Sequence, residues 1–321
     1  MTAGETLARD VWAASRHALP LPGSGETPRR FEALADFGAV DLCLAKLVEP
    51  HHDATAILVE LDGAPPDRDS LWGVWAAEPP HARVRATRGP GGWRLSGTKA
   101  FCSGAALVTH ALMTAAADDG PRLFAVDVAE GRRSGDLSLA APDWVGPGME
   151  RAGTRTLHLE NLAVAAVGDP DSYVRRAGFW QGGAGVAACW LGGARTVAGA
   201  VGAAARGREL DEHAAAHLGA ITAVLDAATA QLHAVADEID RDPRADERNA
   251  RRSAQSLRAT AAAAADEVLW RTARALGPAP LAFDAGHAQH VVDLQVFVRQ
   301  HHGERDLADL GRLAVDQVVR P

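Results

Sequence analysis

The chain has 321 residues, of which 47% are hydrophobic, so it is long enough to bury a sizeable core and to form more than one domain. Its formal net charge of −8 disfavours non-specific nucleic-acid binding, which requires a basic face.

The cysteines and the apolar runs indicate a reduced, cytoplasmic protein. Cys43, Cys102 and Cys189 are odd in number and far apart, which argues against a disulfide framework or a zinc knuckle. No apolar run is long enough to span a bilayer, and the N-terminal residues lack the hydrophobic region of a signal peptide. We therefore expect a cytoplasmic protein with no membrane partner.

A helical pattern covers residues 6–61. Its apolar residues recur at near-helical spacings and are interrupted at Gly38 and Pro50, while residues 20–25 have the composition of a loop. This pattern predicts a short helical region over residues 1–69.

The helical period disappears after Ser70, and alternating runs take its place. Among them, residues 91–104 predict a β-hairpin in which Ser96 and Gly97 turn the chain and a second extended segment follows. Short strands separated by regular turns predict a small antiparallel barrel or sandwich over residues 70–168.

Helical patterns return from Asp171 onward and predict a bundle over residues 169–321. Four long amphipathic segments with short connections favour an up-and-down arrangement. The expected helices cover residues 182–206, 212–239, 246–276 and 285–301. Asp211 is expected to cap the second of them, and Glu304, Arg305 and Asp306 to form a salt-bridged surface turn.

Three segments of the predicted β domain resemble, in order, the middle domain of acyl-CoA dehydrogenases. Residues 75–79 resemble a flavin-contacting strand of that family, and residues 91–104 resemble its glycine-rich hairpin. Residues 145–149, followed by 156–164, resemble its closing strand. The resemblance implies an α+β, acyl-CoA dehydrogenase-like fold with a short helical N-terminal part, a central antiparallel β-barrel domain and a C-terminal helical bundle.

The resemblance also implies FAD as the cofactor, lying between the β domain and the bundle. Val74, Ala76 and Ala77 occupy positions where family members offer backbone groups to the flavin. Phe101 stands where a tryptophan packs against the ring, and Ser103 where a threonine hydroxyl bonds near the flavin N5. The alternative for Phe101 is ordinary core packing.

The family's contacts to the pyrophosphate and adenine are less well matched. An R-x-x-F-G motif places an arginine on the pyrophosphate of a neighbouring subunit, so Arg206 or Arg208 takes that role here, although the Phe-Gly pair is absent. The alternative is a solvated charged helix start capped by Asp211. Gly277 keeps the first glycine of the family's Q-x-x-G-G motif, whose second glycine is Pro278 here.

His301 is the candidate catalytic base. Aligning Asp293 with the aspartate of the family's R-D motif puts His301 at the usual catalytic glutamate. Histidine titrates near neutral pH, as a general base must, and flavin monooxygenases of the same fold often carry histidine there. Hydrogen-bonded structural histidines are the alternative for His301 and His302. We expect no metal site, since adjacent helical residues point about 100° apart.

These features predict an FAD-dependent oxidoreductase acting on an acyl thioester, such as an acyl-CoA, or on a related small molecule. A flavin-dependent monooxygenase of the same fold, and a non-catalytic scaffold or partner subunit, are the alternatives. The small residues of 182–207 permit close helix approach in a core or at a subunit interface, so a homodimer or homotetramer is expected. An electron-transfer partner is also expected from the resemblance.

Overall fold

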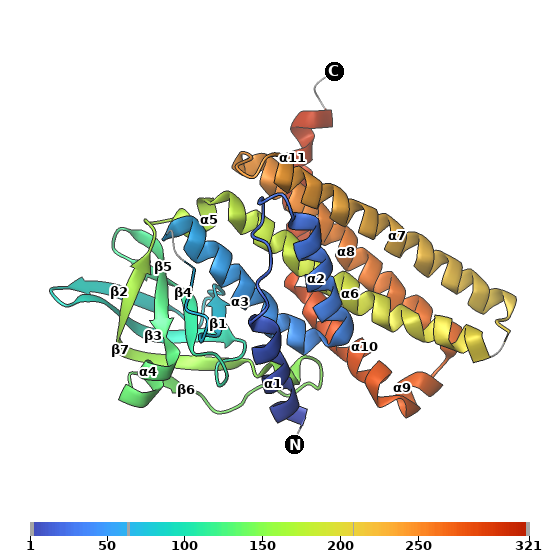
Figure 1. Cartoon of the computed structure of the whole chain (residues 1–321), viewed down its shortest axis with the longest axis horizontal. Helices are drawn as coiled ribbons and strands as arrows, with labels where there is room; N and C mark the ends of the chain where they lie inside the picture. Colours follow the sequence, from blue (N-terminus) through green and yellow to red (C-terminus); the bar gives the residue numbers. More distant parts are fainter. Residues whose placement is uncertain (1–2, 63–64, 208, 319–321) are drawn as a thin grey trace. The chain divides into compact units, whose positions relative to one another are not determined.

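The structure, a computed structural model, describes residues 3–62, 65–207 and 209–318 (Figure 1). The chain divides into two compact units, each made of three separate segments. The β unit contains the described residues of Met1–Ala18, Lys46–Gly146 and Glu150–Phe179. The helical unit contains those of Leu19–Ala45, Pro147–Met149 and Trp180–Pro321.

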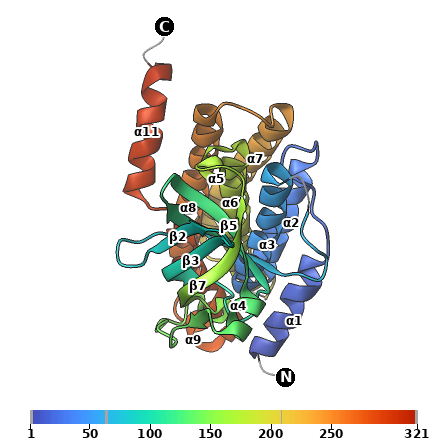
Figure 2. The same cartoon turned by 90° about the vertical axis from the view of Figure 1, so that its left-hand side faces the viewer.

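Seven strands form the sheet of the β unit: β1 (Trp72–Trp75), β2 (Val84–Gly89), β3 (Gly92–Cys102), β4 (His110–Ala117), β5 (Gly120–Asp127), β6 (Leu137–Leu139) and β7 (Arg155–Val167). The hydrogen-bonded order is β1-β4-β2-β3-β7-β5, and β5 pairs back onto β4. Five strands therefore close into a ring, with β1 added beside β4 and β6 beside β7. Figure 2 views this sheet from the side on which β2, β3, β5 and β7 face the reader. The small barrel expected from the alternating runs is confirmed. Most of its strand pairings are antiparallel, as expected, but β4 pairs parallel with β1 and with β2.

The hairpin of the β unit turns at a different place from the one expected. β2 pairs antiparallel with β3 from Val84 and Gly97 to Gly89 and Gly92, so the chain turns between Gly89 and Gly92. Ser96 and Gly97 lie inside β3, where the register with β7 shifts. Gly97 has φ +125°, and an added Cβ would lie 2.3 Å from the Arg83 carbonyl oxygen. The glycine therefore permits a bulge within one long strand, not a turn between two.

The remaining elements of the β unit include α1 (Ala3–Ser15), α4 (Val128–Ser134), η1 (Glu150–Ala152) and α5 (Ser172–Arg175). Most of α3 (Leu42–Leu61) also belongs here and contains Pro50, so the helix continues where the sequence suggested an interruption. Ile57 and Leu58 of α3 join a buried apolar cluster with Trp72, Leu112 and Leu123 of the sheet. This cluster anchors β1, the strand that leads to the candidate site.

The helical unit contains α2 (Thr27–Val40), α6 (Ala177–Gly207, from Trp180 onward), α7 (Glu212–Arg241), α8 (Glu247–Leu276), α9 (Ala279–Phe283), α10 (Ala285–Phe297), η2 (Val298–Gln300) and α11 (Glu304–Val318). Aspartates cap three of these helices. The side chains of Asp211, Asp246 and Asp284 accept hydrogen bonds from the backbone at the third position of α7, α8 and α10. Such caps satisfy amide groups that a helix start leaves without a partner.

Small residues let α2 and α6 approach closely. An added Cβ at Gly38 of α2 would lie 2.1 Å from the Cys189 carbonyl oxygen, and one at Gly192 of α6 would lie 1.8 Å from that of Ala35. These glycines therefore serve packing within one chain.

The turn expected at Glu304–Asp306 is the first turn of α11, a helix of 15 residues. Asp306 accepts a hydrogen bond from the backbone N–H of His302, which satisfies one amide before the helix. On α11, Asp309 is fixed to α8 through Arg251 and Gln255. The expectation of a turn at these residues was wrong because their charge pattern suits a helix start equally well.

The sequence was expected to contain no apolar run long enough to span a bilayer, but two of the described helices, α6 and α7, are long and apolar enough by length and composition. In α6, 72% of the most apolar window is buried, as in the core helix of a soluble protein. In α7 the buried share is 22%.

Candidate functional site

Phe101 is the most unusual residue of the β unit. It lies within the second register shift of β3, between Lys99 and Cys102, and has φ +60°. A bulky residue in the left-handed region is an outlier that persists only where the surroundings enforce it. Its side chain is 55% exposed, so the alternative of ordinary core packing is not what the structure has. The bulge therefore holds an aromatic ring outward from the barrel.

Ser103 follows Phe101 and is held in place from two sides. Its hydroxyl lies 3.0 Å from the hydroxyl of Thr154, and its carbonyl oxygen accepts a hydrogen bond of 3.1 Å from the indole N–H of Trp75. Trp75 ends β1, and Val74 beside it packs against the buried apolar cluster. Ala76 and Ala77 follow directly, and the Ala76 carbonyl lies 3.5 Å from the Thr114 hydroxyl. Val74, Ala76, Ala77, Phe101 and Ser103 thus lie on two adjoining segments.

An ion pair between the buried Lys99 and the half-exposed Glu78 ties these two segments together. The Lys99 side chain is 1% exposed and donates hydrogen bonds of 2.7 and 2.9 Å to the carbonyl and hydroxyl oxygens of Thr114. Thr114 donates in turn to Glu78, whose carboxylate lies 3.6 Å from the Lys99 ammonium. Burial lowers the pKa of Lys99, and the Glu78 carboxylate opposes that shift. Since Glu78 follows Ala77 and Lys99 precedes Phe101, the pair fixes both segments. No sequence motif pointed to this pair; the one available signal was that Lys99 is one of only two lysines.

Cys102 lies beside this pair, and its thiol is unreactive. Burial raises the pKa of its thiol to about 12, against the pull of the nearby Lys99 charge. A thiol with so high a pKa carries almost no thiolate at neutral pH, so it is a poor nucleophile.

His51 is a structural histidine of the β unit with both ring nitrogens in use. Its Nδ1 accepts a hydrogen bond of 3.3 Å from the Trp72 backbone N–H, and its Nε2 lies 3.1 Å from the Ser15 carbonyl oxygen. Burial lowers its pKa, while the bond to Ser15 opposes the shift. These partners require the neutral ring with the proton on Nε2.

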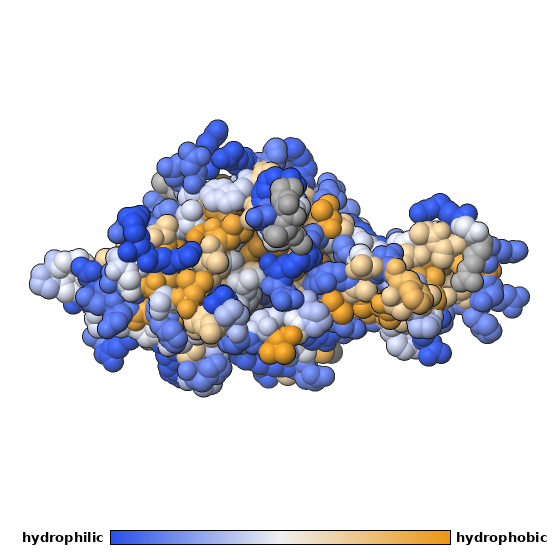
Figure 3. All heavy atoms as spheres, turned by 90° about the horizontal axis from the view of Figure 1, so that it is seen from below, coloured by the Kyte–Doolittle hydropathy of each residue, from blue (hydrophilic) through white to orange (hydrophobic). Residues whose placement is uncertain are grey.

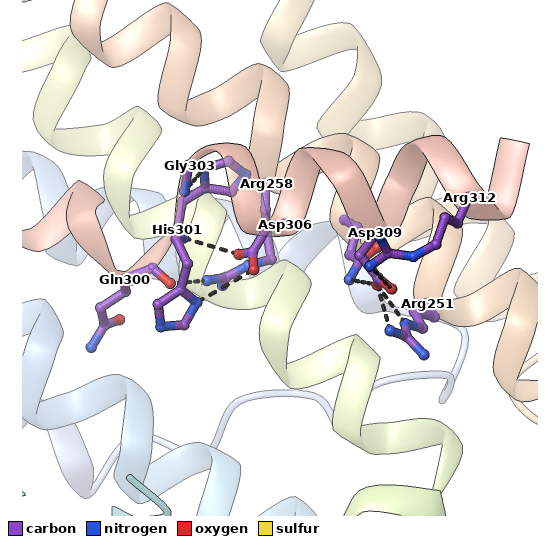
Figure 4. A network of polar contacts seen from close by, with 10 residues as sticks. Arg251, Arg258, Gln300, His301, Gly303, Asp306, Asp309 and Arg312 are labelled. Carbon is purple, nitrogen blue, oxygen red and sulfur yellow. Dashed lines mark hydrogen bonds and ion pairs between the residues drawn. The ribbon is translucent and has the colours of Figure 1, made fainter. Parts of the chain in front are cut away.

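His301 lies in the helical unit, in extended backbone between η2 and α11 (Figure 4). It is 9% exposed. Its Nδ1 accepts a hydrogen bond of 3.2 Å from the Gly303 backbone N–H, so the neutral ring carries its proton on Nε2. Nε2 is buried and has no hydrogen-bond partner among the described residues. Burial lowers the pKa of His301, Asp306 opposes that shift, and Arg258 adds to it. At neutral pH the side chain therefore presents an N–H donor, not a lone pair.

The surroundings of His301 are cationic and aromatic. Arg258 of α8 donates hydrogen bonds to the carbonyl oxygens of Gly183 and Gln300, and its guanidinium lies 4.7 Å from the centre of the Trp190 ring. His302 points elsewhere, with an exposed side chain whose Nδ1 lies 3.4 Å from Asp306. Across the part of the chain that the structure describes, no group of three or more His, Cys, Asp or Glu side chains is placed to hold a metal ion.

The other described candidates of the helical unit, Arg206 and Gly277, lie at helix ends. Arg206 is exposed in the last turn of α6, and Gly277 follows the end of α8 with φ +67°. Arg208 is outside the described residues. From Arg258, beside His301, to Gly277 the chain advances about 19 residues, or roughly 28 Å at the rise of an α-helix. A single ring system in contact with His301 therefore does not reach Gly277 of the same chain.

Comparisons with known proteins identify the fold. No family model and no curated protein matches the sequence. Among solved structures, FMN-bound TdsC from Paenibacillus sp. A11-2, a dibenzothiophene monooxygenase, is similar with a TM-score of 0.78 at 18% identity, covering 98% of this chain and 96% of that one. KijD3 in complex with FMN and a dTDP-linked amino-keto sugar is similar with a TM-score of 0.77 at 19% identity, covering 99% of this chain and 86% of that one. Butyryl-CoA dehydrogenase from Megasphaera elsdenii is similar with a TM-score of 0.74 at 14% identity, covering 88% of this chain and 80% of that one. The fold is that of acyl-CoA dehydrogenase-like flavoproteins, as the sequence motifs predicted.

Proposed function

We propose that this protein is a flavin-dependent oxidoreductase that binds its flavin ring against Phe101 and Ser103 of the β unit. The observation that carries the proposal is the exposed aromatic ring of Phe101, held outward at φ +60° by a bulge. An aromatic side chain in a costly conformation that buries little of its own surface is typical of a ligand-binding position.

The residues beside Phe101 suit a flavin ring. Ser103 offers a hydroxyl, and the segment after Trp75 offers backbone groups at Ala76 and Ala77. Lys99 and Glu78 would keep the two segments at a fixed separation, so little entropy would be lost on binding. A bound flavin supplies hydride acceptance and, once reduced, reaction with O₂.

We infer that FMN fits this chain better than the FAD predicted from the sequence. The adenine half of FAD was assigned to the segment after α8, where Pro278 and Pro280 have no backbone N–H to donate. FMN needs no such contacts. TdsC and KijD3, which share the fold, have FMN in their structures.

The neutral form of His301 favours oxygenation over acyl-CoA dehydrogenation. A dehydrogenase must remove an α-proton, which needs a lone pair on the base. His301 uses its Nδ1 lone pair on Gly303 and carries a proton on Nε2, so it is suited to donate a hydrogen bond to an oxygen atom. In the proposed reaction, substrate, O₂ and reduced flavin give oxygenated substrate, water and oxidised flavin.

An absorbance scan of the purified protein tests the cofactor. We expect flavin bands between the near-UV and 500 nm, and FMN on mass spectrometry of the released cofactor. Titration of flavin-free protein with FMN and with FAD then compares their affinities. A colourless protein that binds neither flavin at high micromolar concentration would support the scaffold alternative instead.

Turnover with supplied reduced flavin tests the reaction class. Indole, dibenzothiophene and an amino-deoxy nucleotide sugar are suitable probes, because similar compounds accompany the structural neighbours. We expect an oxygenated product from at least one class of probe and little oxidation of butyryl-CoA with a dye acceptor. His301→Gln keeps an N–H donor near the position of Nε2, so it should retain more activity than His301→Leu.

Oxidation of butyryl-CoA at rates usual for dehydrogenases, undiminished in His301→Gln, would contradict both the oxygenase assignment and the role of His301. Faster acyl-CoA oxidation by His301→Glu would instead show that only the base is missing.

A further inference from the structure

A partly open hollow of about 330 Å³ lies between α6, α7 and α8 in the helical unit, where these helices run side by side (Figure 1). Trp180 of α6 and Val235 and Ile239 of α7 give it apolar walls. Its polar lining consists of side chains that carry an oxygen acceptor: Gln181, Glu238, Asp242 and Ser253. Among the described residues that line the hollow there is no lysine, arginine or histidine. The hollow therefore offers acceptors and negative charge without a cation of its own.

The two carboxylates of the hollow have no ion-pair partner. Glu238 accepts a hydrogen bond of 2.8 Å from the Ser253 hydroxyl, and neither Glu238 nor Asp242 forms an ion pair with a described residue. Arg251 places its guanidinium 5.4 Å from the centre of the Trp180 ring, but it donates to Asp309 at 2.9 Å. The negative charge of the hollow is therefore not neutralised by the described part of the chain.

The position of these carboxylates on α7 adds to the repulsion between them. Glu238 lies in the last turn of this 30-residue helix, and Asp242 is its C-cap residue. The C-terminal end of an α-helix carries partial negative charge, so it repels a carboxylate and favours a cation. Arg241, the basic residue of that turn, is exposed and pairs with neither carboxylate among the described residues. A cation bound in the hollow would offset this repulsion.

Gln181 gives a separate indication that the hollow receives a hydrogen-bond donor. It is 8% exposed, and its Nε2 donates a hydrogen bond of 3.0 Å to the Pro243 carbonyl oxygen, which fixes the orientation of the amide. Its Oε1 then has no hydrogen-bond partner among the described residues, yet it is not one of the fully covered orphan atoms of the chain. Because Gln181 lines the hollow, a donor can reach this oxygen from there.

We propose that the hollow between α6, α7 and α8 binds the ammonium group of a small primary amine. The three N–H bonds of this group match three acceptors, the Gln181 amide oxygen and the carboxylates of Glu238 and Asp242. A short alkyl chain packs on Trp180 and Val235, and the indole ring adds a cation–π attraction. A calcium or magnesium ion would need about six oxygen ligands, which this lining does not supply. The site is distinct from the flavin position proposed on the β unit and does not depend on it.

Alkyl chains have a second place to bind on the helical unit. Leu281 of α9 is 43% exposed, and Phe283 on the same short helix is 89% exposed. Figure 3 shows apolar side chains gathered on the right of the surface, the side on which Figure 1 draws α9. This helix follows the C-terminal end of α8, whereas the N-terminal turns of α8 line the hollow. Binding of the charged group must therefore be measured separately from binding of the chain.

Ligand-observed NMR on the full chain, at constant ionic strength and with and without added flavin, tests the site. The probes are n-butylammonium, butan-1-ol and butyrate, which share a short alkyl chain and differ in the polar group. We expect saturable binding of butylammonium at millimolar concentration, weaker binding of butan-1-ol and none of butyrate. Glu238→Gln and Asp242→Asn should weaken butylammonium binding, by about ten-fold and about five-fold. Asp237→Asn removes an equal charge from an exposed residue of α7 outside the hollow and should leave the affinity unchanged.

Thermal unfolding gives a second readout. Asp242→Asn removes a carboxylate from the negative end of α7, so it should raise the melting temperature without ligand. Saturating butylammonium should raise the melting temperature of the wild type more than that of Asp242→Asn. Ala250→Leu should fill the hollow and abolish binding.

The proposal is overturned if butylammonium does not saturate, or if Asp237→Asn weakens its binding as much as Asp242→Asn does. Displacement of butylammonium by an equal concentration of potassium would also overturn it, because the hollow would then attract any small cation. Butan-1-ol that binds as tightly as butylammonium would place the alkyl chain elsewhere, on a surface such as that of α9, and would overturn it as well.

Discussion

The two units hold their candidate residues in different ways. In the β unit, the segments that carry Ala77 and Phe101 are cross-linked by the Lys99–Glu78 pair and by the bond from Trp75 to Ser103. In the helical unit, Gly277 follows the end of α8, whereas Arg258, which lies beside His301, is roughly 28 Å away along the same helix. A closed barrel brings several strands to one place, whereas a long helix keeps its residues at fixed distances. We therefore expect flavin binding to depend more on the β unit than on any single helical residue.

Removing Lys99 should produce the largest effect. Lys99→Met leaves the carbonyl and hydroxyl oxygens of Thr114 without their buried donor, so we expect a loss of about 1–3 kcal/mol in the free energy of unfolding and loss of bound flavin. Urea unfolding and flavin titration measure both. The matched control is Lys46→Met, at the other lysine, which is less deeply buried than Lys99. Unchanged flavin affinity in Lys99→Met would mean that the two segments hold their positions without the pair.

Phe101→Gly should separate stability from binding. Glycine relieves the strain at φ +60°, so the free energy of unfolding should stay constant or rise by up to about 1 kcal/mol. Loss of the exposed ring should weaken flavin binding about ten-fold, which is about 1.4 kcal/mol. Asn161→Gly, also at positive φ in the β unit, is the control and should leave flavin affinity intact. A Phe101→Gly protein that binds flavin normally would remove the main support for the proposed site.

The pH dependence of stability tests the histidines of both units. Burial lowers the folded-state pKa of His51 and His301 below the value of about 6.5 expected in the unfolded chain. The unfolded chain then binds protons first as the pH falls. The stability is fully present above pH 6.5 and is lost towards the lower folded pKa, by at most about 1.4 kcal/mol per pH unit for each histidine. Urea unfolding at pH 7.5, 6.5 and 5.5 measures this slope.

His51→Gln should reduce this pH dependence by removing the titrating group of the β unit. His301→Gln should reduce it by removing that of the helical unit. Stability that is constant or increases from pH 6.5 to 5.5 in the wild type would show that neither histidine is held neutral.

The smallest effect is expected for Ser103→Ala. Removing one hydroxyl from the proposed flavin site should weaken flavin binding roughly five-fold, or about 1 kcal/mol, and shift the flavin absorbance bands. Ser96→Ala is a matched control, because it removes a hydroxyl from β3, the strand that leads to Ser103, and this hydroxyl accepts a hydrogen bond from the Asn161 backbone N–H. An equal effect of both substitutions on flavin affinity would indicate a general change in β3, not a contact at Ser103.

The sequence predicted the fold well because its signals are local. Alternating runs distinguished the barrel from the helices, and three motifs in order identified the fold. Ser96–Gly97 was misjudged because a glycine at positive φ serves a bulge as well as a turn, and strand pairing decides between them. The exposure of Phe101 and the burial of Lys99 could not be predicted from the sequence, because both depend on how β3 bends at its second register shift.

Which ring nitrogen of His301 carries the proton could not be predicted from the sequence for a similar reason. The pattern placed a histidine at the position of the usual glutamate, but the bond from Gly303 decides which nitrogen carries the proton. That bond depends on Gly303 at φ +57°, a backbone detail no spacing rule reports.

The close contact between α2 and α6 bears on how the protein is made. During translation the Gly38 face of α2 leaves the ribosome roughly 150 residues before Cys189, which packs against it. Over that interval the whole barrel is synthesised, so the apolar face of α2 has no native partner while β1 to β7 emerge. Pairings between such distant segments slow folding and leave apolar surface open to aggregation. Nascent chains stalled before α6 should therefore bind holdase chaperones strongly, and release should follow once α6 is complete.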